Sequence, residues 1–232
     1  MQQLPLGVRI PDRRIFATFL TAGNEQTVAQ LQALAGGERG GVAWLYGALA
    51  AGKSHLLQAA CVLASEHGRA GYVPLAEFER LGTDALEGLP QLDCVCLDDL
   101  HVVAGQREWE AKLFGLYREM EERGSRLIVS ALHPPAYMPW SLKDLGSRFA
   151  AATLLPLATL AEAQQREALK LHAHARGFEL PEETAQWLQR RHPRDMASMC
   201  GLLDTLDEAG LAAQRRLTIP FIRSVLGARQ QP

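Results

Sequence analysis

Residues 47–54 have the sequence GALAAGKS, which matches the phosphate-binding loop pattern GxxxxGK[ST] without a mismatch. The loop follows VAWLYGA (42–48), a short apolar run typical of a buried parallel strand, and helical spacing resumes at Ser54. Backbone N–H groups and the helix N-terminus would surround a phosphate there. We expect Lys53 to reach the β- and γ-phosphates and Ser54 to bind Mg²⁺; a strand-to-helix turn without a ligand is the alternative. The predicted nucleotide contacts of this segment are Gly47, Ala50, Ala51, Gly52, Lys53, Ser54 and His55.

A second apolar run, CVCLDDL (94–100), carries two adjacent acids near its end. Asp98 is expected to hold Mg²⁺ through water, and Asp99 is placed to polarise an attacking water. Two acids that merely end a strand are the alternative. Cys94 and Cys96 lie two apart in this run, so both face one side and we expect them to pack in the core.

The pattern of strands and helices predicts an α/β fold with a five-stranded parallel sheet. The expected strands are 42–48, 71–75, 94–100, 126–132 and 153–157, with helices at 27–34, 54–66 and 108–123. After Pro156 four segments carry a 3.6-residue period and no strand pattern. We therefore divide the chain into an extended leader (1–14), a nucleotide-binding base (15–158) and a helical domain (159–232).

Composition excludes several classes of protein. The 232 residues contain 24 Lys and Arg against 26 Asp and Glu, a formal net charge of −2, so no strong overall field favours nucleic acid or an anionic membrane. No apolar run is long enough to span a bilayer, and no secretory signal opens the chain. The four cysteines form no CxxC pair, which argues against a disulfide framework or zinc site. We expect a cytoplasmic protein without strong direct DNA binding.

The motifs resemble AAA+ ATPases of the clade of the bacterial replication initiator DnaA. GALAAGKS and LDDLH correspond to its nucleotide site, and FATFLTAGN (16–24) is similar to its adenine-side segment, which places Asn24 beside nucleotide. LIVSALHPP (127–135) resembles the sensor 1 strand with Ser130, and LGSRF (145–149) resembles the arginine-finger box with Arg148. PRDMASMCGLLDTLD (193–207) resembles the sensor 2 helix with Arg194. The resemblance implies an AAA+ αβα base with a small C-terminal helical lid.

The sequence continues only a short way past this lid, so we expect no DNA-binding domain like the initiator's, and the chain resembles the Hda family of DnaA-homologous regulators. That resemblance implies an ADP-bound protein which, with the DNA-loaded sliding clamp (the β subunit of DNA polymerase III), stimulates hydrolysis of DnaA-bound ATP and so prevents re-initiation. Arg148 would act in trans on the partner's γ-phosphate, where a finger contributes a factor of about 10³–10⁵ in rate. AAA+ proteins of this kind associate head to tail, so a homo-oligomer associated with the nucleoid or replisome is expected.

Two segments depart from the family pattern. The sensor 1 segment has Ser130-Ala131-Leu132 where the clade usually has an acid, so we expect weak intrinsic ATP turnover. The chain opens Met1-Gln2-Gln3-Leu4-Pro5-Leu6, which resembles the clamp-binding peptide QLxLPL with Met1 at the Gln position. Either Gln2 or Gln3 takes over the anchor, or clamp binding is weaker, or the natural start lies upstream; a polar leader without a partner is the remaining alternative.

Two other functions fit the phosphate loop. A self-contained AAA+ ATPase of the helicase-loader type predicts sizeable turnover without partners. A P-loop kinase for a small molecule requires an acceptor pocket and a mobile arginine-rich lid. The C-terminal helices are long and regular, which argues against the mobile lid of a kinase. The paired strand-end acids favour water as the attacking group, and we therefore prefer the AAA+ hypothesis.

Overall fold

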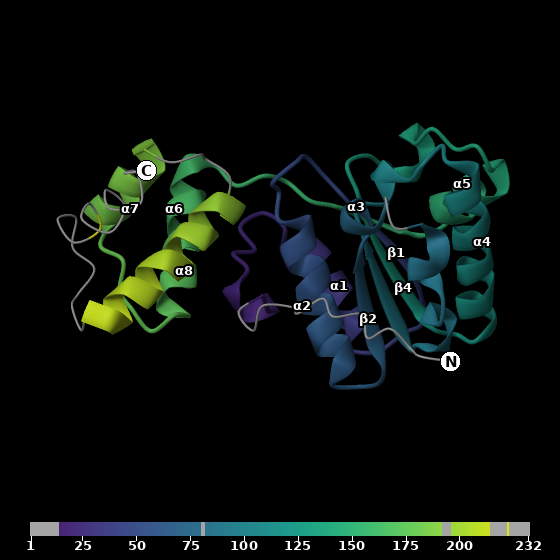
Figure 1. Cartoon of the computed structure of the whole chain (residues 1–232), viewed down its shortest axis with the longest axis horizontal. Helices are drawn as coiled ribbons and strands as arrows, with labels where there is room; N and C mark the ends of the chain where they lie inside the picture. The colour runs from purple at the N-terminus through teal and green to yellow at the C-terminus, as the bar shows by residue number, and fades with distance from the viewer. Residues whose placement is uncertain (1–13, 80–81, 192–195, 214–221, 223–232) are drawn as a thin grey trace. The chain divides into compact units, whose positions relative to one another are not determined.

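The structure is a computed structural model, and it describes residues 14–79, 82–191, 196–213 and 222 (Figure 1). The leader residues Gln2, Gln3, Leu4, Pro5 and Leu6 and the predicted sensor Arg194 lie outside the described residues. The chain forms two compact units. One contains the described residues up to Phe16 and from Gly23 to Thr159, and the other contains Ala17–Ala22 with the described residues from Leu160 onward.

A five-stranded sheet forms the centre of the first unit, in the order β2-β3-β4-β1-β5, and every pair of neighbours is parallel. The strands are β1 (Gly41–Tyr46), β2 (Ala70–Pro74), β3 (Cys94–Asp98), β4 (Arg126–Ala131) and β5 (Thr153–Pro156). Every residue of β3 and β4 is buried, as expected for strands covered on both faces. The predicted five-stranded parallel sheet is confirmed, and the C-terminal ends of its strands share one edge.

Helices cover both faces of this sheet. Figure 1 shows α1 (Glu25–Ala35) and α2 (Lys53–Ser65) on one side, and α4 (Arg107–Glu122) and α5 (Lys143–Ala150) on the other. The four-residue α3 (Leu75–Phe78) follows β2, and four 3-10 turns lie in the described part of the unit: Thr83–Leu86, Leu89–Gln91, Leu100–Val102 and Pro135–Tyr137. A further 3-10 turn, Phe16–Thr18, lies where the chain passes from the first unit to the second. The opposite placement of α2 and α4 follows from right-handed crossovers that leave β1 and β3 in opposite directions.

Aromatic side chains hold α5 against the sheet. Phe149 is fully buried, and its ring centroid lies 5.0 Å from that of Trp44 in β1 and 5.5 Å from that of Tyr117 in α4. Trp140 stacks on the same ring at 5.7 Å. Large aromatic surfaces removed from water dominate the energetics of such a core. This packing fixes α5, the helix that carries Arg148.

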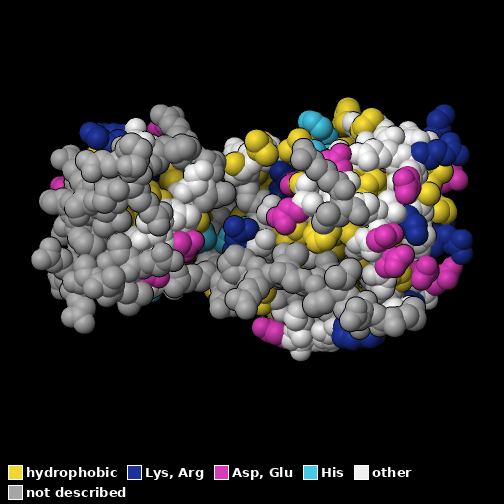
Figure 2. Space-filling model, viewed as in Figure 1, with side chains coloured by type: hydrophobic (Ala, Val, Ile, Leu, Met, Phe, Trp, Pro, Cys, Tyr) yellow, Lys and Arg dark blue, Asp and Glu magenta, His cyan; other side chains and the backbone are white. Residues whose placement is uncertain are grey.

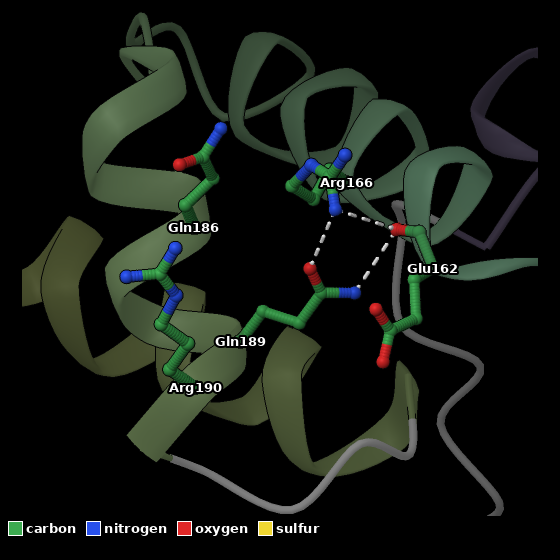
Figure 3. Close-up of a pocket in the computed structure, with 5 residues that line it drawn as sticks. All are labelled: Glu162, Arg166, Gln186, Gln189 and Arg190. Atoms are coloured by element: carbon green, nitrogen blue, oxygen red, sulfur yellow. Dashed lines mark hydrogen bonds between the residues drawn. The ribbon is translucent and has the colours of Figure 1, made fainter.

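In its described part, the second unit contains three α-helices, α6 (Glu162–His174), α7 (Glu182–Arg191) and α8 (Met196–Ala213). Their apolar faces meet in a separate core that includes Leu169, Leu188 and Leu203. Gln189 of α7 is buried, and its amide donates to the Glu162 carbonyl at 3.0 Å and accepts from Arg166 Nη1 at 3.0 Å (Figure 3). These contacts lie in a pocket of about 260 Å³ and tie the start of α6 to the end of α7.

Charged side chains of both signs are interspersed over the region of α4 and α5 in the view of Figure 2. This mixture agrees with the near-zero formal charge of the whole sequence. Among the described residues, no helix combines the length and the apolar character needed to cross a membrane.

Candidate functional site

The phosphate loop connects β1 to α2 and requires glycine at its first position. A Cβ added to Gly47 would lie 2.3 Å from the carbonyl oxygen of Leu157, because the backbone after β5 passes directly beside the loop. Where the two backbone segments lie side by side, the Leu157 N–H also donates to the Tyr46 carbonyl at 2.8 Å. Only a residue without a side chain permits this packing, so Gly47 seats the loop against the sheet.

The loop reverses direction through two left-handed residues. Gly52 has φ +99° and precedes the first turn of α2, as the motif requires. Ala50 has φ +59°, a conformation that costs a non-glycine residue about 1–2 kcal/mol. Ala51 is buried between them, whereas the neighbouring Leu49 is 81% exposed. The loop therefore combines a strained backbone at Ala50 with a largely exposed side chain at Leu49.

Lys53 lies at the start of α2 with its ammonium group folded against the loop. Its Nζ donates to the carbonyl oxygens of Gly47 and Ala48, both at 2.9 Å. Burial lowers the pKa of Lys53, and the nearby carboxylates of Asp99 and Asp98 partly oppose that shift. The half-buried Ser54 follows directly, and its hydroxyl makes no hydrogen bond to the described residues. A cation and a free hydroxyl thus stand together at the helix N-terminus.

Asp98 ends β3 as a buried carboxylate with two hydroxyl donors. Tyr72 of β2 donates to Oδ2 at 2.7 Å, and the Ser130 hydroxyl of β4 donates to Oδ1. Ser130 Oγ in turn accepts the backbone N–H of Asp99 at 2.9 Å. The hydroxyl of Ser130, the predicted sensor residue, is therefore hydrogen-bonded to Asp98, the predicted Mg²⁺ ligand.

Asp99 follows in a left-handed conformation, with φ +56°, and lies beside His101. Burial raises the pKa of Asp99, the neighbouring Asp98 raises it further, and His101 and Lys53 act in the opposite sense. His101 Nδ1 lies 3.8 Å from Asp99 Oδ1 and makes no hydrogen bond in the described part of the chain. Burial is the main cause of the lowered pKa of this histidine.

The residues at this edge fit a magnesium ion bound together with a nucleotide. Asp98 is only 3% exposed and forms no ion pair with a cationic side chain of the described residues, where its charge is compensated by hydroxyls and by Lys53 at longer range. A divalent cation would complete that compensation. The described residues contain no cluster of three or more His, Cys, Asp or Glu able to cage a metal. Mg²⁺ suits this arrangement, because it typically takes one or two protein oxygens and the phosphates.

Two further predicted contacts are held by backbone groups. Asn24 is buried, and its side chain both donates to the Ala158 carbonyl at 3.2 Å and accepts from the Ala158 N–H at 2.8 Å. His55, in the first turn of α2, contacts the Ile15 carbonyl through Nε2 at 3.0 Å. Burial lowers the pKa of His55. Both side chains anchor chain segments around the loop, and their roles toward nucleotide stay predictions.

Arg148 lies in the last turn of α5. Its Nη1 pairs with Glu121 Oε2 of α4 at 2.7 Å. Its guanidinium carbon lies over the rings of Phe114, at 5.3 Å, and Tyr117, at 5.5 Å. The side chain contacts α4 and no residue of the phosphate loop. About a third of its surface (36%) stays exposed.

The site also contains residues that motif analysis missed. Tyr72 belongs to no part of the phosphate-loop or strand-acid patterns, and His101, the last residue of the quoted LDDLH, was given no role of its own. Tyr72 reaches Asp98 because β2 and β3 pair in parallel with Pro74 opposite Asp98, which places Tyr72 two residues back on the same face. A neighbouring strand was predicted, but its register was not. The register therefore decides which side chain supports the acid.

Known proteins match the chain in two parts. The sequence model of the family described as "Bacterial DnaA ATPAse domain" matches residues 11–155, and that of "Hda, lid domain" matches residues 162–226. Domain III of the Thermotoga maritima replication initiation protein DnaA superimposes with a TM-score of 0.74 at 18% identity, over 97% of this chain and 100% of that one.

Two further solved structures share the fold. AMPPCP-bound DnaA from Aquifex aeolicus has a TM-score of 0.65 and 18% identity, over 88% of this chain and 68% of its own. The Thermotoga maritima RuvB Holliday junction branch migration motor has a TM-score of 0.58 and 14% identity, over 90% and 69%. The predicted AAA+ α/β base with a helical lid is confirmed. The chain belongs to the bacterial DnaA ATPase domain family, as a DnaA-homologous AAA+ protein with a lid of the Hda type.

Proposed function

We propose that this protein binds ADP with Mg²⁺ and, together with the DNA-loaded sliding clamp, stimulates hydrolysis of ATP bound to DnaA. DnaA converted to its ADP form would no longer initiate, so the protein would prevent re-initiation of chromosome replication. The observation that carries the proposal is Arg148. Its guanidinium is partly exposed, and within the described residues its ion pair and ring contacts are all with α4 rather than with its own phosphate loop.

The nucleotide site supports the binding part of the proposal. Lys53 would exchange its two carbonyl contacts for phosphate oxygens, with Ala50, Ala51 and Gly52 shaping the loop around them. Mg²⁺, when bound, would supply charge neutralisation of the phosphates and would be held by Ser54 and Asp98. AMPPCP is bound to the similar DnaA from Aquifex aeolicus, which supports an adenine nucleotide here.

The contacts of Ser130 support weak turnover of the protein's own nucleotide. Its hydroxyl donates to Asp98, so it is not free to orient a water or a γ-phosphate oxygen. Asp99 keeps a carboxylate next to the site, but burial and Asp98 raise its pKa. We therefore propose that bound ADP serves mainly as a structural ligand of a regulator.

Arg148 would act on a neighbour's nucleotide. A planar guanidinium spreads its charge over several N–H donors and can replace one carboxylate by two phosphate oxygens without a change of protonation. When the Arg148 guanidinium leaves Glu121, it becomes accessible to a partner that docks on α4 and α5. The partner we propose is DnaA, and a homo-oligomer would use the same surface.

The sliding clamp is proposed to bind the leader. Residues Gln2 to Leu6 lie outside the described residues, so this part rests on Leu4-Pro5-Leu6 and the glutamines before them. A proline-containing extended peptide suits recognition in an apolar groove.

A single-turnover assay tests the whole proposal. Radiolabelled ATP bound to the cognate DnaA would be followed after addition of this protein with ADP and DNA-loaded clamp. Three variants run beside the wild type: Arg148→Ala, Arg118→Ala, and a chain without residues 1–6. Arg118 is the matched control, because it is a surface arginine of α4 that pairs with Glu122.

The expected result is fast hydrolysis with the wild type and Arg118→Ala, and a loss of at least about 100-fold with Arg148→Ala. Removal of residues 1–6 should abolish only the clamp-dependent part. Fast ATP turnover by this protein alone, with DnaA-bound ATP untouched, would instead assign it to the self-contained AAA+ ATPases.

A further inference from the structure

A buried chain of polar side chains leads away from Asp98 on the side opposite Ser130. Tyr72 donates its hydroxyl to Asp98 Oδ2 at 2.7 Å, and the Gln58 side chain of α2 hydrogen-bonds the same hydroxyl. Gln58 Oε1 accepts from Arg14 Nη1 at 2.9 Å. Tyr72 and Gln58 are each 7% exposed, so water does not compete for these contacts. The chain runs across β2 and α2 to the segment that precedes α1.

The chemistry of each member fixes the direction of these bonds. Burial and the Asp98 charge both raise the pKa of Tyr72, so its hydroxyl keeps its proton and donates to the carboxylate. Gln58 accepts from Arg14 through its oxygen and therefore presents its NH₂ group to the Tyr72 oxygen. Each buried polar group is satisfied, which is the condition under which such a network orders its members.

The two oxygens of Asp98 are thus held from opposite sides, Oδ1 by Ser130 and Oδ2 by Tyr72. Each carboxylate oxygen has a further lone pair, so the group can still bind a metal or its water while both donors remain in place. The two donors together define the plane of the carboxylate. A carboxylate with one donor would rotate about its terminal torsion, which has broad minima.

We propose that Tyr72 is a positioning residue for Mg²⁺-dependent nucleotide binding, which fixes the Asp98 carboxylate and is itself held by Gln58 and Arg14. The inference rests on the proposed binding of Mg²⁺ and ADP, and it is independent of the proposed action on DnaA. A tyrosine kept only for packing would make no use of its hydroxyl. Here the Tyr72 hydroxyl donates to Asp98 at the end of β3. Arg14, the first described residue, donates to Gln58 and so links the start of the described chain to the same hydrogen-bond network.

The test is ADP affinity measured by titration calorimetry in Mg²⁺ and in EDTA. The ratio of the two dissociation constants reports the contribution of the metal. For Tyr72→Phe we expect this ratio to fall about tenfold, the scale of one hydrogen bond to a charged group, with ADP affinity in EDTA unchanged. Gln58→Met should lower the ratio in the same direction by about threefold, because it leaves Tyr72 in place without its support.

Tyr46→Phe is the matched control. Tyr46 belongs to the same sheet and is half-buried, and its hydroxyl makes no hydrogen bond within the described residues. For Tyr46→Phe, the ratio of the ADP dissociation constants in EDTA and in Mg²⁺ should equal that of the wild type. Thermal melting without nucleotide would show that each variant folds, and if Tyr72→Phe does not fold, Gln58→Met alone decides.

Three results would overturn the inference, in distinguishable ways. A wild type whose ADP affinity is the same in Mg²⁺ and in EDTA would reject the proposed metal and the inference with it. A wild type that responds to Mg²⁺ beside variants with the same ratio would reject only the role of Tyr72. If Tyr72→Phe loses the same ADP affinity in Mg²⁺ and in EDTA, Tyr72 shapes the nucleotide site and does not position the metal ligand.

Discussion

Arg148 Nη1 and Glu121 Oε2 lie 2.7 Å apart and join the last turn of α5 to α4. The two side chains are 36% and 54% exposed, and exposed pairs of this kind contribute about 0–1 kcal/mol. The rings of Phe114 and Tyr117 lie against the same guanidinium. The arginine is therefore ordered on its own subunit by contacts weak enough to be exchanged for a partner's phosphate.

Loss of the ion pair should favour the proposed action in trans. Glu121→Gln removes the negative charge and leaves the aromatic contacts, so stimulation of hydrolysis of DnaA-bound ATP should rise about two- to fivefold, the equivalent of up to about 1 kcal/mol. Glu122→Gln, which breaks the neighbouring pair with Arg118, is the control. A decrease with Glu121→Gln would mean that the pair holds Arg148 in its active position.

Two glycines should respond to alanine with opposite signs. Gly47→Ala places a methyl group 2.3 Å from the Leu157 carbonyl oxygen, and we expect the free energy of unfolding to fall by about 1–3 kcal/mol. Gly115 lies inside α4 with open space around it, so Gly115→Ala should raise that free energy by about 0.5–1 kcal/mol. Urea denaturation measures both. Destabilisation by Gly115→Ala would show that this face of α4 requires glycine.

Replacement of Phe149 should lower the free energy of unfolding more than replacement of most other core residues. Phe149→Ala empties a fully buried site that contacts Trp44, Tyr117 and Trp140, and we expect a loss of about 3–5 kcal/mol. The near-ultraviolet circular dichroism of the aromatic cluster should change with it. Leu154→Ala, at a position 42% exposed, should cost far less under the same denaturation protocol. Comparable losses at the two positions would contradict this account of the core.

The lid contains an acid with a strongly shifted pKa. The Lys170 ammonium, 2.6 Å from Glu182 Oε2, lowers the pKa of Glu182 from 4.5 to about 2, and Gln186 and Arg166 contribute in the same direction. The carboxylate therefore favours folding fully above pH 4.5, and its contribution disappears as the pH falls through about 2.

Carbon-13 NMR titration of the Glu182 carboxyl group measures this shift directly. The pKa should lie well below 4.5, and Lys170→Met should move it back toward that value. Added salt should have the same effect because the pair is exposed. A midpoint near 4.5 in the wild type would show that the pair does not persist in solution.

The phosphate loop and the parallel sheet could be predicted because their signals are local. Gly52 is required by its left-handed backbone directly before α2, and the apolar runs at β1, β3 and β4 reflect burial on both faces. Predicted strand and helix limits agree with the structure to within one or two residues at most ends. The short α3 and α5 were missed, since four- and eight-residue helices carry too few turns to show a period.

The partners of the site residues depend on strand register and helix packing. The sequence placed Asp98 at a strand end and Ser130 on another strand, but the β3–β4 pairing decided that the serine donates to the acid. The β2–β3 pairing likewise brought Tyr72 to the other oxygen. No local pattern contains that information, because register is set by the whole sheet.

The sequence by itself determined that this chain has a phosphate loop, paired strand-end acids, a parallel sheet and a C-terminal helical unit, because each depends on neighbouring residues. Only the tertiary structure decided that Lys53 rests on its own loop, that Asp98 is held by Tyr72 and Ser130, and that Arg148 pairs with Glu121. The contacts of Asp98 and Arg148 join residues on different strands and helices, and that of Lys53 depends on the fold of its loop against the sheet. They exist only once packing has brought those segments together.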